Sequence, residues 1–555
     1  MCWGKSLRNT SSQSAHVRLL RLTWVVALIV GEYAIFWAIV NRCDWPENSA
    51  WDSSHAAMRE RYRIAIISDP QLTDWSSYHQ SGALLKLVET YTDLYMKRSF
   101  HRLHKSLQPD AVLFLGDLID GGRDSSKAVF DRNTRRFGRV FGTRSSAWNR
   151  APIFMDAEEP AVIPTDGAQV NITGRYEQRL NMLLDANSRE LVRGYGRSAR
   201  LYVAGNHDVG FGNTLGRSSM VRYKQTFGSV NYEVSVGNHS LVVLETLALS
   251  SDIPDIREES QRFLAQLGEV TPKLPRILFT HVPLFRLDTT YCGDARETEQ
   301  LIINRGGEQY QNMIDSSLSQ EALHAVRPDM IFSGDDHDWC EIAHPLDGSF
   351  VPEVTVPTFS FAQGIQQPGF VMLSLYNPDH KVNNQFPVIP TDSPSGLPVS
   401  TLESSGTVAR PSTDATFAYE ACMLPNQLQI YRVYGLLFGC TLSWILIQRY
   451  RWIMRGRGRS RGRALLGKWD IRLQRSSTTT AASANQREDQ SSEESMDDSP
   501  SGPTLRSLDN SYRSRRMSRC SYLPRIYWKM AGWDMGNIAL FALPTYILLF
   551  VVSMF

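Results

Sequence analysis

Five short segments of the chain are rich in the residue types that bind divalent cations. They are Ser68-Asp69-Pro70-Gln71, Gly116-Asp117, Gly205-Asn206-His207-Asp208, Thr280-His281 and Gly334-Asp335-Asp336-His337. Carboxylate, amide and imidazole groups offer oxygen and nitrogen ligands to a metal. One ion does not require so many of them, and the set therefore predicts a site for two divalent cations.

The ligands of such a site have separate roles. Asp117 follows an apolar run and a glycine that permits a tight turn, which makes it the expected bridge between the two ions. The other expected ligands are Asp69 and His337 at the first metal, and Asn206 and His281 at the second. Two cations held in this way acidify a bridging water, which can then attack phosphorus in line. The pattern therefore predicts a hydrolase of phosphate esters.

His207 directly follows an expected ligand and is poorly placed to bind the same ion. It is better placed to contact the phosphate and to protonate the departing oxygen, and we expect Asp208 to orient its ring. A lone histidine or a lone Gly-Asp pair usually serves a turn or the core of a protein. The ordered set of five segments favours catalysis over that alternative.

Apolar runs place the five segments at the ends of strands. Between residues 42 and 376, short apolar runs alternate with helical patterns, which is typical of an α/β layered domain. We expect strands at 63–67, 111–115, 201–204, 240–245, 276–279, 330–332 and 370–375. A helix is expected at 83–106. Residues 142–200, with a helix at 176–193, are expected to form an insertion over the core.

The motifs resemble those of the calcineurin-like metallophosphoesterases, whose signature is Asp-x-His, Gly-Asp, Gly-Asn-His-Asp/Glu, His and Gly-His-x-His. The resemblance covers residues 62–375, and it implies a four-layer α-β-β-α sandwich with the metals on strand-end loops. Residues 68–72, 114–123 and 333–341 look more narrowly like the fungal cell-division-control branch, which is related to the mammalian post-GPI-attachment phosphoesterase. That branch implies removal of ethanolamine phosphate from mannose of GPI anchors in the endoplasmic reticulum, with manganese as cofactor.

Two residues depart from the superfamily pattern. Gln71 stands where a histidine of the first metal is usual, and Asp335 stands where a histidine of the second metal is usual. Exchange of imidazole for oxygen favours Mn²⁺ or Mg²⁺ over Zn²⁺, and we expect two Mn²⁺ ions. The neutral amide of Gln71 also leaves open a weaker first site and hence an inactive scaffold.

Residues outside the ligand set are candidates for binding the substrate. A guanidinium group can hold a phosphate through two hydrogen bonds. The candidates are Asp120, Arg123, Arg286, Arg296 and Tyr310, and ordinary salt bridges are the alternative for the charged ones. Cys340 lies close behind His337, and we expect it to be structural rather than nucleophilic, with Cys292 as a candidate disulfide partner.

Three apolar stretches approach the roughly 20 residues that a membrane-spanning helix needs. They cover residues 22–40, 428–447 and 536–555, and a cleaved signal peptide is the alternative for the first. Glu32 lies in the first stretch, where we expect it to face another helix, a water-filled cleft or the membrane edge. Basic residues precede the first stretch and follow the second, so residues 1–21 and 448–535 are expected in the cytosol. Residues 42–376 are then lumenal.

Composition agrees with a globular protein that carries membrane segments, since 42% of the 555 residues are hydrophobic and the net charge is only +2. Four of the seven cysteines fall in the expected lumenal part and permit up to two disulfides: Cys43, Cys292, Cys340 and Cys422. Asn171 and Asn238 begin sequons there and are candidates for glycosylation.

The remaining segments read as connections and tails. Residues 377–427 are rich in Pro, Ser, Asn and Thr, and we expect a linker that packs little. Residues 474–510 are polar and almost without aromatic side chains, which predicts disorder. The arginine-glycine run at 455–459 is expected to lie against an acidic membrane surface, and no nucleic-acid partner is expected.

Together these features predict a multi-pass protein of the endoplasmic reticulum membrane, with a lumenal phosphodiesterase domain that acts on a GPI-anchored glycolipid or protein. Two alternatives stay open. One is a lumenal phosphomonoesterase or protein phosphatase of the same fold. The other is a non-catalytic membrane adaptor for cargo sorting.

Overall fold

The computed structural model describes residues 15–47, 61–77, 81–142, 198–305, 311–376, 416–477 and 527–548. The chain forms two compact units, which we describe separately. The larger runs from Gly31 to Ile430, and the smaller combines the residues up to Val30 with residues 431–548. The expected helix at 176–193, Asn171 and Tyr310 lie outside the described residues.

Two mixed β-sheets form the centre of the larger unit. The first has the strand order β11-β10-β1-β2-β3. Its strands are β1 (Tyr62–Ile67), β2 (Ala111–Leu115), β3 (Ala199–Val203), β10 (Gly369–Leu375) and β11 (Phe417–Met423). β1, β2 and β3 are parallel, so their carboxyl ends lie at the same end of the sheet, whereas β10 and β11 join antiparallel.

The second sheet has the strand order β4-β5-β6-β7-β9-β8. Its strands are β4 (Tyr232–Val236), β5 (His239–Val243), β6 (Arg276–Phe279), β7 (Met330–Ser333), β8 (Cys340–Leu346) and β9 (Ser349–Thr355). The four inner strands β5, β6, β7 and β9 are parallel, and β4 and β8 pair antiparallel at the two edges.

The two sheets pack face to face, because successive side chains of a strand point to opposite faces. Ile64 and Ile66 of β1 share a buried core with Phe279 of β6. Ala65 and Leu278 belong instead to the core that includes the helices. Each inner strand is therefore buried on both faces, which explains the continuous apolar runs in the sequence.

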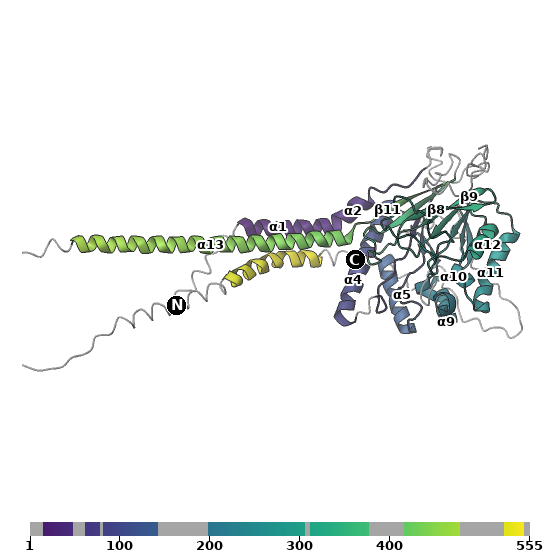
Figure 1. Ribbon diagram of the computed structural model, residues 1–555, viewed down its shortest axis with the longest axis horizontal. Helices are drawn as coiled ribbons and strands as arrows, with labels where there is room; N and C mark the ends of the chain where they lie inside the picture. Colours follow the sequence, from purple (N-terminus) through teal and green to yellow (C-terminus); the bar gives the residue numbers. More distant parts are fainter. Residues whose placement is uncertain are drawn as a thin grey trace, which may run out of the picture. The chain divides into compact units, whose positions relative to one another are not determined.

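Helices cover the outer faces of the sandwich (Figure 1). Those beside the first sheet are α4 (Gly82–Leu107) and α5 (Lys127–Phe141), and those beside the second are α11 (Pro254–Glu269) and α12 (Ser316–Val326). Shorter helices are α8 (Asn206–Val209), α9 (Arg217–Phe227) and α10 (Thr246–Leu249). Phe100 of α4 and Phe137 of α5 pack on Phe114 of β2. This is the α-β-β-α layering expected from the resemblance.

All seven expected strands are present, with ends shifted by at most two residues. The sequence does not predict β4, β8, β9 and β11, which lack a long apolar run. β11 corrects the expectation of a loosely packed linker at 377–427. Phe417 and Cys422 are buried, because this strand adds to the edge of the first sheet beside β10.

The first apolar stretch is a helix interrupted by a π-helical turn. α1 (Ala15–Ile29), the π-helical turn (Val30–Ala34) and α2 (Ile35–Val40) together are long and apolar enough to cross a membrane. Within the larger unit, Glu32 forms a buried ion pair with Arg98 of α4, and Phe36 packs against Tyr95. The Glu32 carboxylate therefore faces another helix, which was one of the three expected solutions to its cost in lipid.

The smaller unit is helical, with α1 beside α13 (Gln427–Ser477) (Figure 1). Trp24 donates to Thr441 of α13, and Arg449 of α13 pairs with Asp534 at 2.5 Å. Residues 427–455 are the second helix that can cross a membrane, so the chain has the character of a membrane protein. The described residues contain these two candidate spans. Of the expected third span at 536–555, residues 549–555 lie outside the described residues, so that span stays a prediction. The described helix at 527–548 includes Asp534 and Asn537, which lower its hydropathy.

Two disulfide bonds lie within the larger unit. Cys292 bonds to Cys340, which confirms the expected pairing, and Cys43 bonds to Cys422. Cys43 follows α2 and Cys422 lies on β11. The second bond therefore ties the segment that enters the unit to the strand from which the chain leaves it.

We expect the double variant Cys43→Ser/Cys422→Ser to lose about 4 kcal/mol of unfolding free energy, because the bond constrains a long loop in the unfolded chain. The two cysteines are 379 residues apart in the sequence. Thermal unfolding of the full chain in detergent without reductant measures the loss. Cys440→Ser, at an exposed free thiol, is the control and should leave the melting temperature unchanged. Equal melting temperatures for both variants would contradict the prediction.

Candidate metal centre

The expected ligands meet where the carboxyl ends of both sheets come together. Asp69 and Asp117 lie in the loops after β1 and β2, and Asn206 is the first residue of α8, which follows β3. The loops after β6 and β7 carry His281, Asp335 and His337. The backbone nitrogen of Asp335 donates to Asp69 Oδ2 at 3.2 Å, which joins the loops of the two sheets directly. The structure thus gathers all six side chains in one place.

Asp69, Asp117 and His337 form the first half of the centre. Their ligand atoms lie within 4.8 Å of one another, and His337 Nε2 is 3.8 Å from Asp69 Oδ1. Gln71 joins them through its amide nitrogen, which donates to Asp117 Oδ2 at 2.7 Å and lies 3.3 Å from His337 Nε2. In this orientation Gln71 supports the bridging carboxylate, and its oxygen would reach a metal only after the amide turns over.

His281 is the centre of the second half. Its Nε2 lies 2.9 Å from Asn206 Oδ1, 3.2 Å from Asp117 Oδ1 and 3.7 Å from Asp335 Oδ1. Its Nδ1 donates to the Leu115 carbonyl at 2.8 Å, a contact that fixes the ring and turns Nε2 toward the other ligands. Asp117 thus faces both halves, one oxygen to each, as a bridging ligand must.

Gly116 makes this arrangement possible. A Cβ at this position would lie 2.3 Å from His281 Nδ1, so any other residue would displace the ring. Its φ of 97° also favours glycine. The Gly-Asp motif therefore serves two purposes, since the glycine makes room for one ligand and the aspartate is another.

The backbone of the centre is strained. Five of the nine non-glycine residues with positive φ in the described chain belong to it: Asp69, Gln71, Asp117, Asp335 and His337. Such conformations cost on the order of 1–3 kcal/mol each and persist only where the surrounding structure holds them. The ligand positions are therefore imposed by the fold.

The chemistry of the cluster fits divalent cations. Asp69 Oδ1 is buried and has no hydrogen-bond partner among the described residues. Asn206 Oδ1 faces acceptor atoms of Asp117 and Asp335, and a reversed amide would donate to both of them. Burial, reinforced by the neighbouring carboxylates, raises the pKa of Asp335 to about 8 against the opposing effect of His281. Cations between these groups would satisfy the orphaned oxygens and relieve the repulsion.

Asp120, and not Asp208, orients His207. The ring Nδ1 of His207 lies 2.7 Å from the Asp120 carbonyl oxygen and 2.9 Å from its carboxylate. Burial alone would lower the pKa of His207, but Asp117 and Asp120 outweigh it and raise the pKa to about 10. The ring therefore carries a proton at neutral pH, as a donor to a leaving oxygen requires.

The Asp208 carboxylate has a structural task instead. It accepts hydrogen bonds from the backbone nitrogens of Leu118, Ile119 and Gly205 at 3.0–3.2 Å. These contacts tie the loop after β2 to the loop after β3. This corrects the expectation that Asp208 orients His207. The Asp208 carboxylate binds backbone nitrogens, and the carboxylate that contacts the His207 ring is that of Asp120, from the loop after β2. The sequence pattern that could have predicted a role for Asp120 is Gly-Asp-x-x-Asp after a strand.

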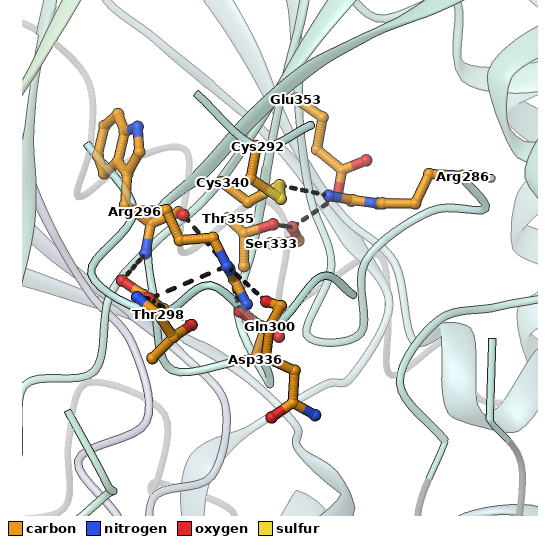
Figure 2. The surroundings of a disulfide bond; sticks show 12 residues. Arg286, Cys292, Arg296, Thr298, Gln300, Ser333, Asp336, Cys340, Glu353 and Thr355 are labelled. Atoms are coloured by element: carbon orange, nitrogen blue, oxygen red, sulfur yellow. Dashed lines mark hydrogen bonds and ion pairs between the residues drawn. A yellow bond between two sulfur atoms is a disulfide. The ribbon is translucent and has the colours of Figure 1, made fainter. Parts of the chain in front are cut away.

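The candidate substrate-binding arginines separate into two groups. Arg123 Nη1 is buried without a hydrogen-bond partner among the described residues, and the Arg123 backbone nitrogen donates to the His207 carbonyl at 2.8 Å. Arg123 stays a candidate for holding phosphate. Arg286 and Arg296 are corrected, because both guanidinium groups are buried in ion pairs around the Cys292–Cys340 disulfide (Figure 2).

No protein-family model matches the chain. Cell division control protein 1 of Saccharomyces cerevisiae is 28% identical over 432 residues, which cover 76% of this chain and 72% of that protein. Metallophosphoesterase 1 of Mus musculus is 25% identical over 388 residues, which cover 65% of this chain and 81% of that protein. Similarity to these relatives supports a calcineurin-like metallophosphoesterase that is related to the cell-division-control branch.

This metallophosphoesterase also resembles a solved purple acid phosphatase from yellow lupin (Lupinus luteus), with 12% identity, a TM-score of 0.30 and coverage of 60% of this chain and 51% of that one. It is a phosphoric ester hydrolase. Divalent cations at its centre would supply Lewis acidity and an activated water. The chain itself would supply a proton from the His207 ring, which Asp120 orients.

We expect Asp120→Asn in the metallophosphoesterase to lower kcat about 10–100-fold, because the protonated His207 ring loses its charged partner. Bound metal, measured by elemental analysis, should stay at the wild-type level. Asp347→Asn, at an exposed carboxylate in the β8–β9 turn, is the control and should leave kcat unchanged. An Asp120→Asn enzyme with full activity on an aryl phosphate would show that the dyad has no catalytic role.

Glu353 makes the stability of the metallophosphoesterase depend on acid pH. Burial alone would raise its pKa, but Arg286 at 2.8 Å, His344 and Ser333 lower it to about 2. A depressed pKa stabilises the fold above the unfolded value of 4.5, and this contribution is lost as the pH falls toward 2. The stability difference between wild type and Glu353→Gln should therefore shrink by about 3 kcal/mol over that range. Unfolding curves at several pH values measure it, and a constant difference would contradict the assignment.

Proposed function

We propose that the chain is a membrane-tethered phosphodiesterase that removes ethanolamine phosphate from mannose of GPI anchors in the lumen of the endoplasmic reticulum. The observation that carries the hydrolytic part is the Asp117 carboxylate, which faces both halves of the metal centre beside the protonated His207. The substrate class rests on the resemblance to the cell-division-control branch.

Tethering supports a lipid-borne substrate. A catalytic unit attached to a membrane helix meets substrates in the same bilayer at a high effective concentration. The two helices that can cross a membrane flank the larger unit in sequence, at Ala15–Val40 and Gln427–Arg455. Both disulfides lie between them, which supports an oxidising compartment such as the lumen.

The donor set supports manganese as the cofactor. Oxygen ligands predominate, since Asp69, Asp117, Asn206 and Asp335 face only His281 and His337 as nitrogen donors. Such a set suits Mn²⁺ or Mg²⁺ better than Zn²⁺. Tight zinc binding with no manganese binding would overturn this choice of metal.

The decisive assay compares two substrates on the full chain in detergent with Mn²⁺. Wild type should release ethanolamine phosphate from a GPI that carries it, and Asp117→Asn should lower this activity at least about 100-fold, because the two metals lose their shared ligand. Asp255→Asn, at an exposed carboxylate of α11, is the matched control. Cleavage of an aryl phosphate alone would refute the glycolipid substrate. Equal function of wild type and Asp117→Asn in cells would favour the non-catalytic adaptor.

A further inference from the structure

A long irregular segment lies against the turn that carries two of the metal ligands. Residues 280–315 connect β6 to α12, and their described part contains neither helix nor strand. Within this connection, residues 292–300 contact the turn at 334–340 repeatedly (Figure 2). We call residues 292–300 the buttress.

The side chains of the turn alternate in direction. Asp335 and His337 face the metal centre, as their distances to His281 and Asp69 show. Asp336 and Asp338 have their partners in the buttress instead. One face of the turn therefore carries ligands, and the other is an attachment surface.

Asp338 makes the denser set of contacts with the buttress. Its carboxylate accepts from the Glu297 nitrogen at 3.1 Å, and from the nitrogen and hydroxyl of Thr298 at 2.8 and 2.9 Å. It also accepts from its own neighbour, the Trp339 nitrogen, at 2.8 Å. Asp338 is buried, so loss of these bonds would leave its charge without compensation.

Arg296 contacts the same turn at residues both before and after His337. Its Nη1 donates to Asp336 Oδ2 at 2.6 Å and to the Trp339 carbonyl at 3.3 Å, and its Nε donates to the Gln300 carbonyl at 2.9 Å (Figure 2). The side chain is 6% exposed, which leaves it inaccessible to substrate. A guanidinium can make these bonds together because its donors point in several fixed directions.

The buttress is itself anchored at Cys292, its first residue, and at Glu297 within it. Cys292 is bonded to Cys340, and its carbonyl accepts from the Glu341 nitrogen at 3.1 Å. The Glu297 carboxylate accepts from the backbone nitrogens of Gln366 and Gln367 at 2.8 and 2.9 Å. The segment can therefore hold the turn in place without regular secondary structure of its own.

The turn needs such support because its ligands are strained. Asp335 and His337 have φ of 68° and 72°, and nothing in a free chain favours two left-handed non-glycine residues so close together. Partners outside the ligand set commonly change metal affinity 10–100-fold, because they orient the ligands. We propose that Arg296 and Asp338 are positioning residues that hold Asp335 and His337 in their metal-binding conformation and so set the affinity of the centre for divalent cations.

Mn²⁺ binding to the full chain in detergent tests this assignment without any substrate. Free Mn²⁺ is followed by electron paramagnetic resonance during a titration, so the readout is independent of catalysis. Arg296→Gln and Asp338→Ala should raise Kd about 10–100-fold. Arg296→Lys and Asp338→Asn keep part of the contacts and should fall between these variants and wild type.

The matched control is Arg276→Gln. Arg276 is also a buried arginine with a carboxylate partner, Glu233, but it begins β6, at the opposite end of the strand from His281. It should lower the melting temperature and leave Kd unchanged. A wild-type Kd in both Arg296→Gln and Asp338→Asn would overturn the proposal, as would an equal loss of affinity in Arg276→Gln or a wild type that binds no Mn²⁺.

The inference rests on the metal centre and not on the glycolipid. If the wild type binds Mn²⁺ and the Arg296 and Asp338 variants bind it weakly, the positioning role stands even where GPI cleavage fails. Should Asp338→Ala fail to fold, Asp338→Asn, which has the same shape, still gives the comparison.

Discussion

The Asp117 carboxylate is the point at which the two sheets become one site. It sits at the end of β2 in the first sheet, yet one oxygen faces His281 from the second sheet while the other accepts from Gln71. The contact depends on Gly116, whose missing side chain lets the His281 ring reach the Leu115 carbonyl. A shift between the two sheets would separate the halves of the centre, so the packed core between them determines the site geometry.

This geometry brings together groups that repel one another. The carboxylates of Asp69 and Asp117 are buried, that of Asp335 is partly buried beside them, and all three residues have left-handed backbone. Neither feature is stable by itself. Charge on the centre is balanced by imidazole rings and, in the active protein, by cations. Strain is balanced by contacts from outside, such as Thr358, which donates to the Asp69 carbonyl at 2.7 Å.

The sequence predicts the fold, and it predicts which side chains meet at the ends of the sheets, for a physical reason. Inner strands buried on both faces leave long apolar runs, and the polar residues that follow them must lie at the sheet ends. Edge strands such as β11 leave a weaker pattern, and the sequence predicts part of a linker where this strand lies. The directions of side chains in loops are not encoded by spacing alone. Asp208 is adjacent to His207 in sequence whereas Asp120 lies 87 residues earlier, and only the tertiary structure decides which one contacts the ring.

Arg286 and Arg296 also show that sequence alone does not predict the contacts of a side chain in a loop. An arginine after a site strand can hold phosphate or a neighbouring carboxylate, and the sequence does not reveal which partner is nearer. Here the partners are Glu353 and Asp336, both presented by the same region of the second sheet. The second sheet thus contributes two ligands from one turn, and of the two arginines only Arg296 pairs with a carboxylate of that turn. In the first sheet, Asp208 and backbone bonds such as Gln71 to Asp117 at 2.8 Å tie together the segments that follow β1, β2 and β3. Arg123, which follows β2, has a guanidinium nitrogen without a hydrogen-bond partner among the described residues, so a phosphate is still a possible partner for it.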